Sequence, residues 1–495
     1  MALMTRDQFL AGLRQVGHRV FIQGERIDDV VEHPVSRPSA LAMAETYHQA
    51  TQAGPNDLFI ARSHLTGDTI NRFTHVHQST DDLVKKILML RSLGRRTASC
   101  FQRCAGLDCL NTLHAVTYET DQAFGTRYHS RFVDFLGYVQ RNDLVAAACM
   151  TDPKGDRSLS PSEQADKDLY LRIVGETDDG IVVRGAKMHI TGATNSHELI
   201  AVPTRALKEE DRDYAVAFAV PADTRGVTLI YGRQPSDTRR LEPGRPDVGN
   251  LHFGGCEALV VFDDVFVPEE RIFMKREYKM ANRLVELFSA HHRASYGGCK
   301  VGVGDVLIGA TAALAEAQGT EKASHVKDKL AEMVHLNETL HGAALASAVK
   351  GTPTPSGAYT VDPLLANVCK LNVTRLPFEI ARLAQDIAGG VLVTLPSVAD
   401  QDHPDIGPYV RKYLAGKADV GSDLRMRLVR LVENITLGAG AASYLTESIH
   451  GAGSPQAQKI MITRLADVDS CKAWALQLCG AASLAGSGQS STVDG

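Results

Sequence analysis

The pattern of hydrophobic and polar positions changes twice along the chain and divides it into three stretches. Residues 1–145 are predicted to be mainly helical, with a helical period that has few breakers between 79 and 124. In 146–270, short apolar runs alternate with Gly, Pro and Asp, as in a β-barrel or sandwich. Long helical periods return in 271–485, and the Gly- and Ser-rich residues 486–495 are expected to form a flexible tail. The predicted fold is therefore α+β, with an N-terminal helical domain, a middle β-domain and a C-terminal helical bundle.

The individual elements follow from local signals. Ser79 and Asp82 resemble a capping box, with Asp in place of the usual Glu or Gln, and predict the start of a helix. This helix is expected to end near Gly94, so that a second helix just after it carries Cys100 and Cys104. Strands are predicted on both sides of the turn at 178–180, at 169–174 and 181–184, and further along at 199–202, 215–220, 227–231 and 258–262.

Composition and charge narrow the class of protein. The chain has 495 residues, 44% hydrophobic and 22% charged, which is ordinary for a globular protein with more than one substructure. A net charge of −5 gives no reason to expect nucleic acid or an anionic membrane as a partner. We see no uncharged apolar stretch long enough to cross a bilayer and no secretory signal pattern, so we expect a cytoplasmic protein.

The nine cysteines do not resemble a disulfide framework, because their number is odd and they are scattered over a long chain. Most are expected to be buried and chemically inert. Cys100 and Cys104 are spaced i, i+4 and would share one face of a helix, whereas Cys109 would point elsewhere. A Cys-x3-Cys pair alone is only a weak indication of a metal site.

The run of residues 291–300 concentrates reactive side chains. If it is helical, Tyr296 lies about 40° and Cys299 about 20° around the axis from His292, with Lys300 about 80° away. All four would share one face, and the glycines between them would allow something bulky to approach the backbone. Together with Cys100 and Cys104, these residues could bind tetrahedral zinc or an iron–sulfur cluster.

Two polar loops are candidates for contact with a flavin. Thr side chains and backbone N–H groups in such loops can bond the edge of a flavin ring, although an ordinary surface loop has the same composition. The first loop consists of Met150, Thr151, Asp152, Pro153, Lys154, Gly155, Asp156 and Arg157, and the second, within 187–195, contains His189, Ile190 and Thr191.

Two further features have both a structural and a functional interpretation. Gly389 and Gly390 follow a predicted helix, where they could form a C-cap or allow the backbone to approach a pyrophosphate. Glu257 and Glu447 are isolated carboxyl groups in apolar or Gly-rich surroundings, where burial could raise their pKa. A solvated surface carboxylate is the more common outcome for a single Glu.

At this point the motifs resemble, in the same order, those of the 4-hydroxybutyryl-CoA dehydratase family. The resemblance extends from about residue 5 to about 470 and does not cover the end of the chain. The combination of three cysteines and one histidine distinguishes that family from the related flavin-dependent 4-hydroxyphenylacetate 3-hydroxylases. The motifs are residues 100–104, 150–157, 292–300 and 446–456.

The resemblance implies an acyl-CoA dehydrogenase-like fold, a homotetramer, and FAD close to a [4Fe-4S] cluster, with the CoA thioester between them. It implies dehydration of 4-hydroxybutyryl-CoA to crotonyl-CoA and isomerisation of vinylacetyl-CoA to the same product. The implied cluster ligands are Cys100, Cys104, His292 and Cys299. The implied catalytic residues are His292, Gln102, Thr191, Glu257, Tyr296, Lys300 and Glu447.

The chemistry explains why such an enzyme needs two cofactors. The hydrogen lost from C3 is not acidic, and a positioned base supplies only about 10²–10⁴-fold. In the family mechanism, a base, here His292, takes the C2 proton, and one-electron oxidation by the flavin gives a ketyl-type radical whose C3 hydrogen is acidic. A cluster iron then helps the hydroxyl to leave, with Tyr296 or Glu447 as proton donor.

Two other classes of protein remain open at this stage. A flavin-dependent aromatic monooxygenase or an acyl-CoA dehydrogenase on the same scaffold would explain the polar loops but would leave the three cysteines and the histidine unused. A zinc-stapled helical protein without catalytic activity would use those four residues and no flavin.

Overall fold

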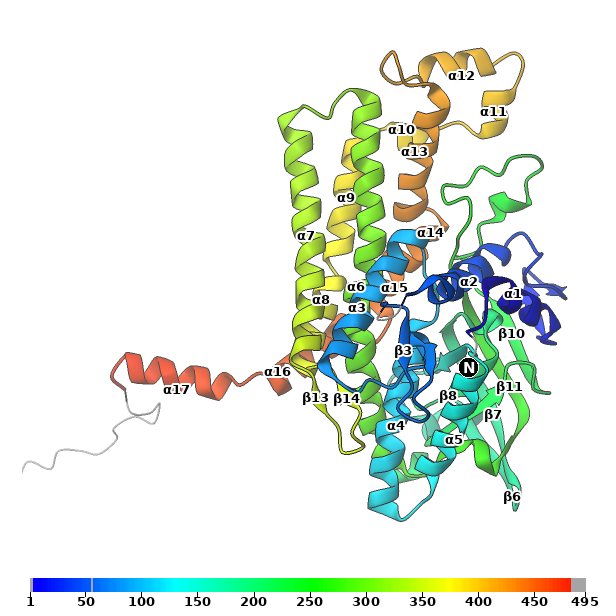
Figure 1. Cartoon of the computed structure of the whole chain (residues 1–495), viewed down its shortest axis with the longest axis vertical. Coiled ribbons are helices and arrows are strands. Elements are labelled where there is room, and N and C mark those ends of the chain that lie inside the picture. The colour runs from blue at the N-terminus through cyan, green and yellow to red at the C-terminus, as the bar shows by residue number, and fades with distance from the viewer. Residues whose placement is uncertain (1–2, 55–56, 482–495) are drawn as a thin grey trace, which may run out of the picture.

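The computed structural model describes residues 3–54 and 57–481, so the predicted tail at 486–495 lies outside the described residues. Figure 1 shows long helices side by side next to a region of strands, with α16 and α17 extending away from the body. The α-helices are α1 Arg6–Gln15, α2 Arg37–Gln52, α3 Thr80–Thr97, α4 Cys104–Phe124, α5 Tyr128–Arg141, α6 Tyr278–Gln318, α7 Ser324–Val349, α8 Pro363–Val373, α9 Leu376–Ala388, α10 Val391–Thr394, α11 Val398–Asp402, α12 Gly407–Tyr413, α13 Ser422–Thr436, α14 Ala439–Ala441, α15 Glu447–His450, α16 Pro455–Leu465 and α17 Val468–Leu478. A π-helical turn, Ala442–Thr446, lies between α14 and α15.

The strands form two larger sheets and two small hairpins. A six-stranded sheet has the order β2-β1-β10-β11-β7-β6, and a four-stranded sheet has the order β12-β9-β8-β5. The strands are β1 Val20–Ile22, β2 Glu25–Ile27, β3 Ile60–Arg62, β4 Thr69–Asn71, β5 Ala146–Cys149, β6 Arg172–Thr177, β7 Gly180–Thr191, β8 Glu198–Ala201, β9 Val216–Pro221, β10 Val227–Tyr231, β11 Glu257–Pro268, β12 Ile272–Lys275, β13 Thr352–Pro353 and β14 Tyr359–Thr360. Each large sheet has free edges, so the closed barrel that we considered from the sequence is not shown.

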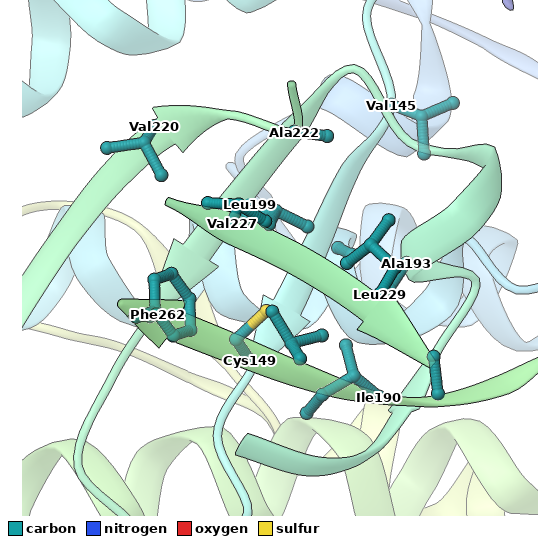
Figure 2. Close-up of a cluster of buried hydrophobic side chains, with 14 of the residues drawn as sticks. Val145, Cys149, Ile190, Ala193, Leu199, Val220, Ala222, Val227, Leu229 and Phe262 are labelled. Atoms are coloured by element: carbon teal, nitrogen blue, oxygen red, sulfur yellow. The ribbon is translucent and has the colours of Figure 1, made fainter. Parts of the chain in front are cut away.

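Each predicted strand of the middle stretch is found, but β7 and β11 extend well beyond the predicted 181–184 and 258–262, and β6 begins three residues later than predicted. The hairpin of β6 and β7 turns at the predicted position, and β1 and β2, which we did not predict, extend the same sheet by pairing β1 parallel to β10. One core joins the two sheets: Figure 2 shows Cys149 and Leu199 of the four-stranded sheet packed with Ile190, Leu229 and Phe262 of the six-stranded sheet. Strands thus occur on both sides of the predicted boundaries at 145 and 270, and the three-part division stays a prediction.

Helix α6 is the centre of the helical part. It packs against α3, α4, α7, α8 and α9. A Cβ at Gly298 would lie 2.7 Å from the Ile87 carbonyl oxygen of α3, so this glycine is needed for close helix contact. The bulky group expected beside this glycine is therefore a neighbouring helix. Helix α6 is long and apolar enough to cross a membrane, but 61% of its most apolar window is buried inside the protein, as in a core helix.

The segment between α3 and α4 differs from the prediction. Helix α3 begins after Ser79 as predicted, where the Ser79 hydroxyl accepts from the Asp82 N–H, but it continues through Gly94 to Thr97. Gly94 does not end the helix because it packs against the backbone of α6, where a Cβ would lie 2.6 Å from a carbonyl oxygen. Ala98 then adopts a left-handed conformation, and α4 begins only at residue 104. The prediction that Cys100 lies on a helix is therefore wrong.

Candidate functional site

The run of residues 291–300 is helical, as predicted, and its reactive groups do share one face of α6. The rings of His292 and Tyr296 are in edge-to-face contact with their centroids 5.1 Å apart. The Lys300 Nζ lies 5.2 Å from the centre of the Tyr296 ring. Cys299 is partly exposed and lies one turn beyond Tyr296.

The three predicted cysteine ligands meet at one cavity. Cys100, Cys104 and Cys299 line it together, and Lys300 and Ser443 lie on its wall. Burial raises the pKa of all three thiols, and the charge of a neighbouring cysteine contributes to the increase for Cys100 and for Cys104. Because metals bind thiolates, an iron centre here would release these protons as it binds.

His292 is not among the residues that line this cavity; it lies on α6 two turns before Cys299 and is oriented by a buried carboxylate. Its Nδ1 is 2.8 Å from Asp108 Oδ2, and Asp108 is one turn after Cys104 on α4. Burial favours the neutral acid, but Lys86, whose Nζ lies 2.5 Å away, and His292 lower the pKa of Asp108 to about 2. A permanently charged Asp108 holds the proton on Nδ1 and leaves Nε2 free to bind a metal or to accept a proton.

Sequence reasoning missed Asp108 and Lys86. The signal was available for Asp108, because its i, i+4 spacing from Cys104 places a carboxyl group next to a predicted ligand. No comparable local signal exists for Lys86, which lies on α3 and reaches Asp108 only in the folded chain.

Within residues 3–54 and 57–481, no three His, Cys, Asp or Glu side chains are close enough to hold one metal ion. This result argues against the zinc alternative, in which all four ligands surround a single ion. A four-iron cube imposes a different geometry, because each ligand binds its own iron and the ligand atoms lie further apart. Three thiols around one cavity, with a histidine of fixed tautomer two turns before Cys299 on α6, are compatible with such a cube.

The carboxyl groups of Glu257 and Glu447 are held in different ways. Glu257 begins β11 directly opposite Thr191 of β7, whose hydroxyl donates to Glu257 Oε1 at 2.7 Å. Lys300 donates to Glu447 Oε2 at 2.9 Å. Burial and the neighbouring Glu447 raise the pKa of Glu257 well above its ordinary value, while Thr191 and Lys300 act in the opposite sense. The raised pKa favours a proton on Glu257, beside the ion pair of Lys300 with Glu447.

Tyr296 also keeps its proton. Burial raises the pKa of its phenol, and the negative charge of Glu447 raises it further. Its hydroxyl lies so close to Gly451 that a Cβ there would be 1.6 Å from it. Tyr296 and Glu257 are thus better suited as proton donors than Glu447, which is paired with Lys300.

Gln102 has mainly internal partners. It adopts a left-handed conformation with φ +69, and its amide nitrogen donates to the Ser39 carbonyl at 2.9 Å. Its amide oxygen accepts from Asn195 at 2.8 Å. These bonds hold the loop between Cys100 and Cys104, so Gln102 shapes the cysteine loop from within.

The two segments predicted to be flavin-binding loops lie next to each other, but the second is a loop only in part, because residues 187–191 belong to β7. The Met188 N–H donates to the Thr151 carbonyl at 2.7 Å. Lys187 links the loops further through an ion pair of 2.6 Å with Asp152 and a bond of 3.0 Å to the Met150 carbonyl.

The other predicted residues of these loops have mixed surroundings. His189 has a left-handed backbone, and the charges of Lys154 and His450 act on its imidazole. Ile190 points into the core, so only its backbone could face a ligand (Figure 2). Pro153, Gly155, Asp156 and Arg157 continue the first loop, where the Asp156 N–H donates to Gln164.

Gly389 caps α9, as its structural interpretation predicted. Its N–H donates to the Gln385 carbonyl at 2.9 Å, and its φ is +76. No described atom lies within 4 Å of a Cβ built at Gly389 or Gly390, so the backbone is open to close approach. A role in binding a pyrophosphate stays a prediction.

Comparison with protein families supports the resemblance seen in the sequence. The N-terminal model of the 4-hydroxyphenylacetate 3-hydroxylases matches residues 5–274, and the C-terminal model matches residues 281–480. The chain belongs to the 4-hydroxyphenylacetate 3-hydroxylase family. Because the two models together match most of the chain, the similarity is not limited to the short motifs.

Individual relatives divide the family into two groups. The chain is 54% identical to the 4-hydroxybutyryl-CoA dehydratase/vinylacetyl-CoA-Delta-isomerase of Clostridium aminobutyricum, over 97% of this chain and 99% of that protein. It is 26% identical to the oxygenase component of a 4-hydroxyphenylacetate 3-monooxygenase from a Geobacillus species, over 92% of each chain. The dehydratase is thus the far more similar of the two.

Among solved structures, too, a dehydratase is more similar to this chain than an oxygenase component. An oxygen-tolerant archaeal 4-hydroxybutyryl-CoA dehydratase from N. maritimus superimposes with a TM-score of 0.95 at 51% identity, covering 97% of this chain and 95% of that one. The oxygenase component of a 4-hydroxyphenylacetate 3-monooxygenase, complexed with FAD, gives 0.83 at 22% identity, covering 96% and 98%, which establishes the fold alone.

Proposed function

We propose that this protein dehydrates 4-hydroxybutyryl-CoA to crotonyl-CoA and isomerises vinylacetyl-CoA to the same product. The observation that carries the proposal is the cavity lined by Cys100, Cys104 and Cys299, which an aromatic hydroxylase would not need. The high identity to a dehydratase/isomerase over nearly the whole chain supports the same reaction.

The proposed cofactors are FAD and a [4Fe-4S] cluster bound by Cys100, Cys104, Cys299 and His292. Support for the cluster comes from the three thiols at one cavity and from the free Nε2 of the Asp108-bound histidine. Support for FAD comes from the family and from the paired loops at 150–157 and 187–195. These cofactors would supply one-electron chemistry and a Lewis acid for the leaving hydroxyl. A homotetramer in the cytoplasm, without nucleic acid or membrane partners, completes the proposal.

The side chains of the site have separate roles in this reaction. His292 would be a weakly bound ligand, and once released from the iron its Nε2 can accept the C2 proton, with Asp108, which stays charged, stabilising the imidazolium. Glu257 and Tyr296 hold protons that can be given to the leaving hydroxyl. Lys300 and Glu447 form the ion pair that fixes their surroundings.

Anaerobically purified protein tests this proposal directly. We expect crotonyl-CoA to form from 4-hydroxybutyryl-CoA and from vinylacetyl-CoA. A protein that forms crotonyl-CoA from 3-hydroxybutyryl-CoA alone would contradict the proposal, because that substrate needs no activation of an unreactive C–H bond.

The role of His292 has its own test. His292→Ala should abolish dehydratase turnover, and Asp108→Asn should reduce it by roughly 10- to 100-fold, the usual effect of losing a group that orients a metal ligand. A purified His292→Ala protein with full turnover would show that this role is wrong.

A further inference from the structure

Lys370 is a buried cation that the proposed mechanism does not use. It lies on α8, its side chain is 0% exposed, and among the described residues no carboxylate pairs with it. Its Nζ donates to the Ser448 carbonyl at 2.6 Å and lies 4.7 Å from the centre of the Tyr296 ring. Burial, together with the charges of Lys300 and Arg293, lowers the pKa of Lys370 to about 7.

Arg293 is a second cation of this kind, one residue after the proposed ligand His292. It donates to Asn367 Oδ1 at 2.8 Å and to the Ala452 carbonyl at 3.0 Å, both of which are neutral. Burial lowers its pKa to about 10. An unpaired buried charge is costly, and truly unpaired ones are rare in folded proteins. The two cations act on each other, and Lys370 is also within electrostatic range of Cys299, so this region is suited to face negative charge.

Lys370 also fixes the segment that carries Glu447. Lys300 donates to the Ser443 carbonyl and to the Glu447 carboxylate, and Lys370 donates to the Ser448 carbonyl. Between these points the chain passes from a π-helical turn into α15, where the regular pattern of helical hydrogen bonds is interrupted. The two lysines come from different helices, so together they hold Glu447 from two sides.

We propose that Lys370 is a positioning residue of this site: it holds the Glu447 segment against Tyr296 and places a positive charge within electrostatic range of the proposed ligand Cys299. The inference rests on the proposed function, since it assumes a cluster with three thiolate ligands. The negative charge of a bound cluster favours the protonated form of Lys370, and that positive charge in turn favours the more negative, reduced state of the cluster. The hydrogen bond to Ser448 keeps Glu447 within reach of Lys300.

Three substitutions at this position separate the charge from the hydrogen bond. Lys370→Met removes both at similar length, Lys370→Gln keeps a donor without charge, and Lys370→Arg keeps both. Lys85→Met serves as a control, because Lys85 pairs with Asp81 at the surface of α3, 2.7 Å away. Each protein is purified anaerobically, and its iron content, its cluster midpoint potential, kcat and KM are measured.

We expect Lys370→Met to lower kcat by roughly 10- to 100-fold, as for a small misplacement of catalytic groups, with KM nearly unchanged. Its midpoint potential should be more negative than that of the wild type. Lys370→Gln should show the same midpoint potential as Lys370→Met but a smaller loss of kcat. Lys370→Arg should have the midpoint potential of the wild type. The control should match the wild type throughout.

Wild-type kcat and potential in Lys370→Met would overturn the inference. So would equal shifts of potential in Lys370→Met and Lys370→Arg, since the charge would then not be the cause. If Lys370→Met does not fold, the comparison of Lys370→Gln with Lys370→Arg decides. A wild-type protein that holds a cluster but forms no crotonyl-CoA would refute the proposed function alone, because the potentials of the variants would still test Lys370.

Discussion

The two segments that carry the cysteines of the site differ in how their geometry is fixed. On α6, Cys299 follows Tyr296 and His292 at helical spacing, so their relative directions are set by the backbone alone. Cys100 lies in the loop after α3, which contains left-handed residues at Ala98 and Gln102. The loop depends on distant partners, such as the bond of 2.8 Å from the Asn250 side chain to the Thr97 carbonyl. The geometry of the α6 residues is thus set by local helical structure, whereas the position of Cys100 depends on contacts with residues far away in the sequence.

The largest expected effect comes from replacing one cysteine of each segment. Cys299→Ala and Cys100→Ala should both abolish measurable turnover and lower the iron content, because each removes a ligand of the same cluster. Cys109→Ala is the matched control: Cys109 lies on α4 but is fully buried in a different apolar cluster, with Leu110 and Val139. Iron analysis and turnover are measured for all three. Full iron content in Cys100→Ala would show that Cys100, and therefore the loop that carries it, does not bind the cluster.

Glu257→Gln should lower turnover by about 10²-fold or more, the usual contribution of a positioned acid. Because the pKa of Glu257 is raised, the wild-type group keeps its proton to a higher pH than an ordinary carboxyl group and loses it as pH rises through that pKa. Wild-type activity should therefore fall at high pH, and this decline should be absent from the residual activity of Glu257→Gln. A pH profile of kcat checks this. If the activity of Glu257→Gln falls at high pH as that of the wild type does, the titrating group is not Glu257.

Gly451→Ala should destabilise the protein by about 1–3 kcal/mol, because its Cβ would overlap the Tyr296 hydroxyl. Removing that hydroxyl in Gly451→Ala/Tyr296→Phe should recover most of the free energy of unfolding without recovering activity. Denaturation of the two single variants and the double variant measures the coupling. Additive losses would mean that the two groups do not meet.

The smallest effect is expected at the start of α3, the helix that precedes the Cys100 loop. Ser79→Ala removes the hydroxyl that accepts from Asp82 N–H at 3.2 Å and should cost about 1 kcal/mol of stability. Turnover should be unchanged, because α3 is also held by its contact with α6. A large loss of activity would show that the position of α3 is less robust than its packing suggests.

The sequence predicted those parts of the site that depend on regular structure. The shared face of His292, Tyr296, Cys299 and Lys300 followed from helical spacing. The pairing of Thr191 with Glu257 was not foreseen, because Thr191 was assigned to a loop and the predicted strand at 258–262 began after Glu257. The helix expected to carry Cys100 was wrong, because Gly94 serves helix packing and does not end α3.

Other features had no local signal at all. The unpaired cation Lys370 meets Tyr296 and Ser448 only through the packing of α8 against α6 and the segment that follows α14. The strands β1 and β2 were missed because each has only three residues and gains its stability by extending a sheet formed elsewhere in the chain.

The iron and flavin content of anaerobically purified wild-type protein tests the central claim most directly. If Cys100, Cys104, Cys299 and His292 bind a cluster beside a flavin, the protein should be brown and contain about four irons and one flavin per chain. A yellow protein that contains flavin but no iron would contradict the account and favour a flavin monooxygenase. A colourless protein with one zinc would contradict both.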